Sequence, residues 1–274
     1  MSDTSPVRMK RGYVRMGFRG LRGGLSMSSA SRGSNAKVNP RKTDVAKGAA
    51  DIVLTDDNFA SIAAAVEEGR AVFANLTKFI VWTLPTNAGQ SLIILASILT
   101  GLALPVLPVQ LLWVNIVTDG APALALGLDR DSAVMRQRPR DPQSPLLDQG
   151  SLRFILMAGC TLAVVGGVLL LVMPRLGFTL PQTRTAIFLH ITIGQLFYAY
   201  PARRNIVSGA PPRFNGALHL AVVLGIGLQL LTVLVPGLRL LLGLEPLTLK
   251  LLLLVITSVL LAWGVAEAYI RLAK

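Results

Sequence analysis

Long apolar runs alternate with short polar connections over most of this chain. From about residue 79 onward, the pattern predicts six helical spans, each about long enough to cross the roughly 30 Å hydrocarbon core of a bilayer. The expected spans are residues 79–103, 107–128, 152–173, 185–201, 216–238 and 247–269. The pattern therefore predicts an all-α membrane protein with six transmembrane helices.

The residues before the spans follow other patterns. Residues 1–42 are rich in Arg, Gly and Ser and show no sustained apolar period, which is typical of a disordered segment. Residues 43–58 contain a short β-prone apolar run that ends in acids and Asn, as at a strand followed by a helix start. Residues 59–78 are predicted to form an amphipathic helix in water that continues into the first span.

Composition and charge agree with a membrane location. Only 15% of the residues are charged, and 27 Lys and Arg outnumber 14 Asp and Glu. The connections 129–153 and 202–214 hold more arginine than the alternating ones, so both are predicted to be cytoplasmic, with both termini on the same side. We expect a multi-pass protein of the plasma membrane whose partner is the lipid bilayer. Nucleic acid is not an expected partner, because the basic residues form no folded basic face.

The second span carries polar residues at membrane depth. Asn115 and Asp119 are four residues apart, so on an α-helix they share one face, with Thr118 beside them. An intramembrane carboxylate usually faces a cavity, an ion path or a partner. Gly120 and Pro122 weaken the helix at this point, which can free backbone carbonyls to act as ligands. The alternative is a polar cluster that only packs helices together.

Other spans add neutral polar groups. Asn87 and Gln90 lie on one face of the first span, just after the kink expected at Pro85, and Gln195 lies in the fourth span. Amide, hydroxyl and carbonyl oxygens with one carboxylate suit a hard cation. Cys160 is the only cysteine, so the chain has no internal disulfide and no cysteine-based metal site.

No energy source is visible among the motifs. The sequence contains no glycine-rich phosphate loop with Lys and Ser or Thr, and no soluble segment large enough to fold around a nucleotide. Taken alone, the residues leave open a six-span ion-conducting or carrier protein that works without ATP.

Several segments resemble P-type cation-transporting ATPases, most closely the calcium-type subgroup. Residues 43–47 and 49–59 resemble the end of the phosphorylation domain. Trp82–Gln90, Leu107–Gly120 and Met135–Arg140 resemble the fifth span, the sixth span and the loop after it. The resemblance covers about 43–274. It implies that residues 43–58 are a remnant of the α/β phosphorylation domain and that 59–78 form the stalk helix. It also implies that 79–274 form the carboxy-terminal membrane domain, the last six of ten spans.

The resemblance also implies ligands for a transported cation, calcium or another hard cation. Asn115, Thr118 and Asp119 match cation ligands of the calcium-type pumps, and Asn87 matches another. Gln90 and Gln195 stand where two-site calcium pumps carry glutamate. Because both acids of one family site are replaced by amides, we expect a single site built around Asp119.

The front of the chain departs from the family. The DKTGT, TGES and TGDGVNDAPAL motifs are absent from this sequence. The complete family uses ATP and Mg²⁺, but we expect no cofactor in this chain and no ATP hydrolysis by this chain alone. We expect a truncated pump, or half of a split pump whose missing ATPase domains lie on a separate chain. The alternatives are the ATP-independent channel or carrier and a non-functional fragment.

Overall fold

The computed structural model describes residues 59–129, 144–206 and 214–272. The chain divides into two compact units, Met1–Val66 and Glu67–Lys274, and the helix arrangement given below is that of the second. Two predictions, the disordered segment 1–42 and the strand within 43–58, lie outside the described residues. Most arginines used for the orientation lie outside them too.

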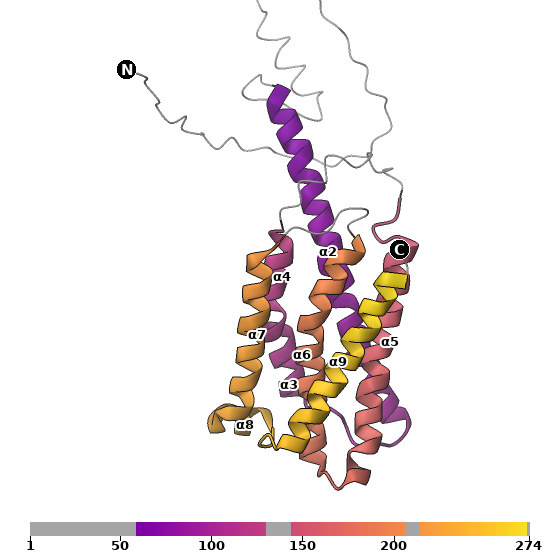
Figure 1. Cartoon of the computed structure of the whole chain (residues 1–274), viewed down its shortest axis with the longest axis vertical. Helices are drawn as coiled ribbons and strands as arrows, with labels where there is room; N and C mark the ends of the chain where they lie inside the picture. The colour runs from indigo at the N-terminus through magenta and orange to yellow at the C-terminus, as the bar shows by residue number, and fades with distance from the viewer. Residues whose placement is uncertain (1–58, 130–143, 207–213, 273–274) are drawn as a thin grey trace, which may run out of the picture. The chain divides into compact units, whose positions relative to one another are not determined.

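The described residues form helices joined by short turns, and no strand occurs among them. This confirms the predicted all-helical membrane fold. The long helices are α2 (Phe59–Leu99), α5 (Gln149–Val172), α6 (Leu180–Ile206), α7 (Gly216–Leu234) and α9 (Leu249–Leu272) (Figure 1). The short ones are α3 (Pro108–Trp113), the π-helix η1 (Val114–Thr118), α4 (Gly120–Gly127), the 3₁₀-helix η3 (Pro174–Leu176) and α8 (Pro236–Leu242).

The predicted amphipathic helix 59–78 and most of the first predicted span belong to one helix, α2. Pro85 lies inside this helix without ending it. The helix ends at Leu99, earlier than the predicted limit of 103. Just beyond, Gly101 adopts φ 68°, and the Leu102 N–H donates to the Ser97 carbonyl at 2.9 Å. This left-handed glycine ends the helix and turns the chain toward α3.

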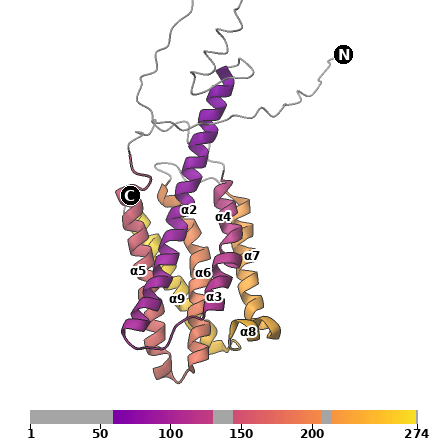
Figure 2. The same ribbon diagram turned by 180° about the vertical axis from the view of Figure 1, so that it is seen from behind.

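Within the ranges that the structure describes, five helical stretches are long and apolar enough to cross a membrane. They are Ala60–Leu99, Pro108–Gly127, Gln149–Leu176, Gly216–Leu234 and Leu249–Leu272. The fourth predicted span corresponds to α6, which has the length but not the apolarity. Figure 1 shows α9 in front of α6, and Figure 2, from behind, shows α2 in front of it. Every residue from 185 to 192 is buried, so α6 is the interior helix of the bundle.

The second predicted span is built from three short helices stacked end to end. The segments α3, η1 and α4 follow one another as one rod that lies beside α7 (Figures 1 and 2). The start of this rod is fixed by Gln110, whose amide donates to the Leu242 carbonyl at the end of α8 (2.9 Å). The three short helices continue in one direction, although the hydrogen bonding changes from α-helical to π-helical at Val114–Thr118.

Two glycines bring α2 and α5 into close contact at the level of Pro85. A Cβ atom on Gly89 would lie 3.0 Å from the Gly159 carbonyl oxygen, and one on Gly159 would lie 3.1 Å from the Pro85 carbonyl oxygen. Small residues allow membrane helices to approach this closely. The contact fixes the part of α2 that carries Asn87 and Gln90.

Replacing Gly159 with alanine is therefore expected to lower the free energy of unfolding by about 1–3 kcal/mol, because the added methyl meets backbone that cannot move away. Gly167 in the same helix is the matched control, since a Cβ there would meet no atom within 4 Å. Gly167→Ala should leave stability unchanged or slightly raised. Thermal unfolding in detergent measures both, and equal effects of the two variants would contradict the close contact.

Candidate cation site

Three of the predicted site residues meet across three segments of the bundle. The side-chain amide of Gln195 in α6 donates to Oδ1 of Asp119 at 2.7 Å. The amide of Gln90 in α2 donates in turn to Oε1 of Gln195 at 3.4 Å. Gln90 and Gln195 are 5% and 0% exposed, and Asp119 is half-buried. A row of interior hydrogen bonds thus ends on a carboxylate between η1 and α4.

Two further hydrogen bonds hold α6 in place near Gln195. The indole Nε1 of Trp82, a fully buried residue of α2, donates to the Gln195 carbonyl at 2.7 Å. On the other side of α6, the Tyr198 hydroxyl donates to the Ala262 carbonyl of α9 at 3.1 Å. These two bonds fix the height and rotation of α6, and they therefore aim the Gln195 amide at Asp119.

Thr118 has a partner that sequence reasoning missed. Gln229 of α7 donates from Nε2 to the Thr118 hydroxyl oxygen at 2.8 Å, and both residues are buried. The available signal was a lone amide inside the apolar run 216–238. Because Thr118 immediately precedes Asp119, this contact brings α7 next to the row formed by α2 and α6.

The other two predicted ligands lie apart from this row. Asn115 is exposed, and its side-chain amide donates to the Leu111 carbonyl of its own helix at 3.0 Å. Asn87 is half-buried, and its backbone carbonyl accepts a bond from the Ser91 hydroxyl at 2.9 Å. Among the described hydrogen bonds, none joins either asparagine to Asp119. The structure therefore brings together Gln90, Gln195 and Asp119, and Thr118 with α7.

The helix around Asp119 changes its hydrogen bonding without breaking. Residues Val114–Thr118 form a π turn, in which the Asp119 N–H donates to the Val114 carbonyl at 3.1 Å. The α-helical spacing behind the predicted shared face therefore does not apply within this turn. Pro122 follows and has no N–H, so the Thr118 carbonyl lacks its usual α-helical donor. The loss of this donor is the basis for expecting a backbone ligand near the carboxylate.

The chemistry of this region is that of oxygen ligands. Within the described ranges, no three His, Cys, Asp or Glu side chains gather as a metal site. The polar groups near Asp119 are instead amides, a hydroxyl and a backbone carbonyl. Such oxygens can bind a hard cation, and soft metals would prefer sulfur or imidazole.

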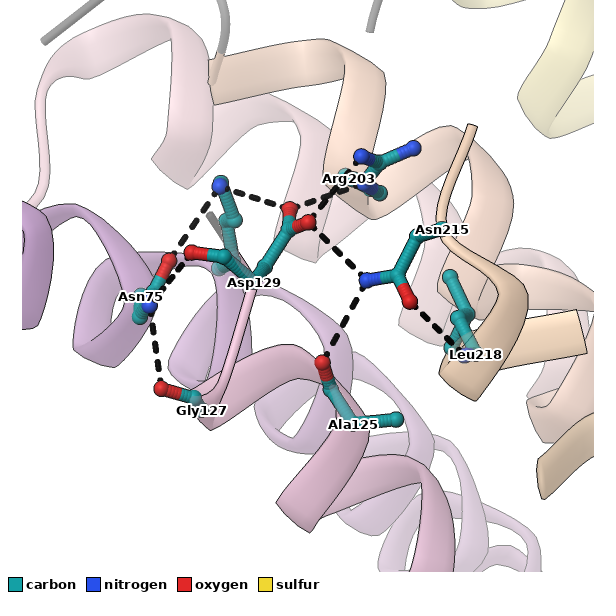
Figure 3. Close-up of polar contacts among 8 residues, drawn as sticks. Asn75, Ala125, Gly127, Asp129, Arg203, Asn215 and Leu218 are labelled. Atoms are coloured by element: carbon teal, nitrogen blue, oxygen red, sulfur yellow. Dashed lines mark hydrogen bonds and ion pairs between the residues drawn. The ribbon is translucent and has the colours of Figure 1, made fainter. Parts of the chain in front are cut away.

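A second polar cluster, centred on Asp129, lies beyond the end of α4 (Figure 3). Oδ2 of Asp129 accepts from Lys78 Nζ and from Arg203 Nε, both at 2.8 Å. Oδ1 accepts from Arg203 Nη2 at 3.0 Å and from Asn215 Nδ2 at 2.9 Å. The cluster joins α2, α6 and the start of α7 to the end of α4.

The electrostatics of this cluster favour the charged carboxylate. Burial alone would raise the pKa of Asp129, but the hydrogen bonds and positive charges of Arg203 and Lys78 outweigh it and hold that pKa below its ordinary value of 3.8. Asn75 donates to the carbonyls of Gly127 and Asp129 at 2.9 and 2.8 Å and accepts from Lys78 at 3.2 Å (Figure 3). Sequence reasoning missed this cluster, although Lys78 and Asp129 each stand at the edge of a predicted span.

The fold and the polar interior together define a multi-pass helical membrane domain with oxygen-bearing side chains between its helices. The family model described as "Cation transporting ATPase, C-terminus" matches residues 103–272, well over half of the chain. The chain therefore belongs to the P-type cation-transporting ATPases and contains the carboxy-terminal membrane domain of that family. This confirms the resemblance found in the sequence motifs.

Individual relatives agree with this assignment. The "Probable cation-transporting ATPase F" of Mycobacterium tuberculosis is 44% identical over 183 residues, which cover 66% of this chain and 20% of the relative. The "Calcium-transporting ATPase 1" of Bacillus cereus is 33% identical over 267 residues, covering 89% and 29%. The "Calcium-transporting ATPase" of Bacillus subtilis is 37% identical over 205 residues, covering 72% and 22%. The chain thus spans less than a third of the length of these relatives.

Proposed function

We propose that this chain supplies side chains from α2, the η1–α4 junction and α6 to the intramembrane cation site of a P-type pump. The observation that carries the proposal is the buried row from Gln90 through Gln195 to the Asp119 carboxylate. Each of these three side chains has an oxygen that can rotate toward a cation, and Asp119 supplies the negative charge. Thr118 adds a hydroxyl oxygen, and Asn115 and Asn87 are outer candidates on the same two segments.

The proposed site holds one ion. Gln90 and Gln195 contribute neutral oxygens, so Asp119 is the only acid among the proposed ligands. The oxygen ligands favour a hard cation, and two of the relatives are named as calcium-transporting. Calcium is therefore the first ion to test, with magnesium, manganese, sodium and protons as alternatives.

We propose six spans, with α6 as the interior one, and both termini in the cytoplasm of a plasma-membrane protein. In support of this orientation, Arg203, Arg204 and Arg271 lie at the ends of α6 and α9 on the side of the Asp129 cluster. Residues 59–78 of α2 would act as the stalk helix. ATP and Mg²⁺ would be handled by the catalytic domains of a complete pump, on this or another polypeptide, and this chain alone should not hydrolyse ATP.

Binding of calcium to the full chain in lipid nanodiscs, measured by titration calorimetry, tests the site. Asp119→Asn is expected to weaken binding tenfold or more, because a neutral amide replaces the only proposed acid. Asp148→Asn is the matched control, since Asp148 caps α5 by accepting from the Ser151 N–H at 2.8 Å and asparagine caps equally well. If Asp119→Asn bound calcium as tightly as the control, the proposed site would be wrong.

A further inference from the structure

Gln229 is a buried polar residue that the proposed site has not used. It lies in α7 and is 0% exposed. Its Nε2 donates to the Thr118 hydroxyl oxygen at 2.8 Å. Its Oε1 is buried and has no hydrogen-bond partner in the described part of the chain. One end of this amide is thus bound, and the other is an unoccupied acceptor.

The other fully buried glutamines of the bundle do not share this arrangement. Gln110 accepts from the Leu107 N–H and donates to the Leu242 carbonyl, both at 2.9 Å. Gln195 accepts from Gln90 and donates to Asp119. In each, both ends of the amide are bonded. Since a buried polar atom without a partner is unfavourable, the free oxygen of Gln229 needs a partner that the helices do not provide.

The surroundings of Gln229 indicate a cation as that partner. Thr118 uses one lone pair of its hydroxyl oxygen to accept the Gln229 amide, which leaves a second lone pair for another bond. The Thr118 backbone carbonyl lacks its α-helical donor because of Pro122. The next residue is Asp119, the proposed acid. Several acceptors therefore gather at one level of the bundle, and acceptors of this kind are matched by a positive ion.

We propose that α7 extends the cation site, with Oε1 of Gln229 as a direct ligand and Thr118 as its neighbour. This inference rests on the proposed function of Asp119. The site would then draw oxygens from four segments: α2, η1, α6 and α7. Gln229 would also hold the Thr118 hydroxyl so that its free lone pair faces the ion.

Calcium titration of the full chain in nanodiscs tests this with two variants at one position. Gln229→Leu removes the oxygen at nearly constant volume and should weaken calcium binding about tenfold. Gln229→Glu places a charged oxygen at the same reach and should strengthen binding about tenfold. A residue that only packs helices would not give opposite changes in affinity for these two substitutions.

Thr232 offers the matched control on the same helix. It is also 0% exposed, and among the described hydrogen bonds its hydroxyl donates to the backbone carbonyl of Gln229 (2.7 Å) and to no side chain. Thr232→Val should leave calcium affinity unchanged. Thermal unfolding without calcium shows whether each variant is folded, and Gln229→Leu keeps the test valid if the glutamate variant does not fold.

The outcomes separate this inference from the proposed function. If Asp119→Asn weakens binding while both Gln229 variants bind like the wild type, α7 lies outside the site and the inference alone is wrong. If Asp119→Asn also binds like the wild type, or the wild type binds no calcium, the proposed site fails and the inference fails with it. If Gln229→Leu and Thr232→Val weaken binding equally, the effect is one of packing and overturns the inference.

Discussion

Replacing Asp129 with asparagine is expected to lower the free energy of unfolding by about 3–5 kcal/mol, because removing one partner of a buried ion pair leaves the other charge uncompensated. The Lys78 side chain is 1% exposed and the Arg203 side chain 11% exposed, and both bond to the Asp129 carboxylate. An asparagine can still accept hydrogen bonds but brings no charge. Lys78 would then be a buried cation without a counterion. Unfolding by heat or denaturant in detergent measures this decrease in the free energy of unfolding.

A double-mutant cycle tests whether charge is the cause. Lys78→Met removes the more buried of the two cations that bond to Asp129. It leaves Asp129 paired with Arg203 (Figure 3), so this variant alone should be only mildly destabilised. The Lys78→Met, Asp129→Asn double variant should recover much of the stability lost in Asp129→Asn. Glu67→Gln, an exposed acid in the same helix as Lys78, is the control and should leave stability nearly unchanged. Strictly additive losses would contradict the ion-pair explanation.

The pH dependence of stability provides a second check on Asp129. The pKa of this carboxyl is held below its ordinary value of 3.8 in the folded protein. Its contribution to stability is therefore fully present above the unfolded pKa and is lost as the pH falls through the lower folded pKa. The wild type should lose stability below about pH 4, and Asp129→Asn should lack that component. Parallel curves for the two proteins would contradict the lowered pKa.

The sequence could predict positions along each helix better than contacts between helices. Apolar runs placed all six predicted spans on helices of the bundle. They did not predict that Asp129 would bond to Lys78 and Arg203, which are 51 and 74 residues away along the chain. Periodicity tells which residues share a face of one helix, but the rotation of that helix against its neighbours depends on packing. For this reason, the Asp129 cluster could be identified only from the structure.

The difference between positions on one helix and contacts between helices also explains which residues around Asp119 could be predicted. Gln195 could be predicted both as an amide in an apolar span and from the resemblance to the cation-transporting ATPases, and the structure bonds it to Asp119. Gln229 is also a lone amide in an apolar run, but neither helical periodicity nor the resemblance marked it as a site residue. The exposure of Asn115 was also missed, since the shared-face prediction assumed an α-helix where the chain forms a π turn.

The weak apolarity of α6 has a physical reason. Helices that face lipid must be apolar on that side, whereas an interior helix contacts only other helices. Along α6, His190, Thr192 and Gln195 are all fully buried, and each bonds to a group of the protein. An interior helix with buried polar residues, such as α6, therefore has too low a mean hydropathy to be identified as a membrane span. This is consistent with the proposal of six spans, in which α6 is the interior one.

Replacing Gln195 with glutamate is expected to raise the calcium affinity about a hundredfold, because it places a second carboxylate beside Asp119 in a water-poor interior. The Gln195 amide now donates to Oδ1 of Asp119 at 2.7 Å. A glutamate cannot donate when charged, so two like charges at this distance repel each other unless a cation or proton lies between them. The variant should be less stable than the wild type without calcium and should regain stability when calcium binds, as binding to the folded state requires.

Gln110→Glu is the matched control for this prediction. Gln110 is equally buried, and its hydrogen bonds in the described part of the chain go to backbone groups of Leu107 and Leu242. This substitution should also destabilise the protein, yet calcium should not restore its stability. Thermal unfolding at increasing calcium concentrations, together with titration calorimetry, distinguishes the two. If Gln195→Glu and Gln110→Glu responded alike to calcium, the carboxylate of Asp119 would not be part of a cation site. If only Gln195→Glu is rescued, the interior of α6 faces the ion.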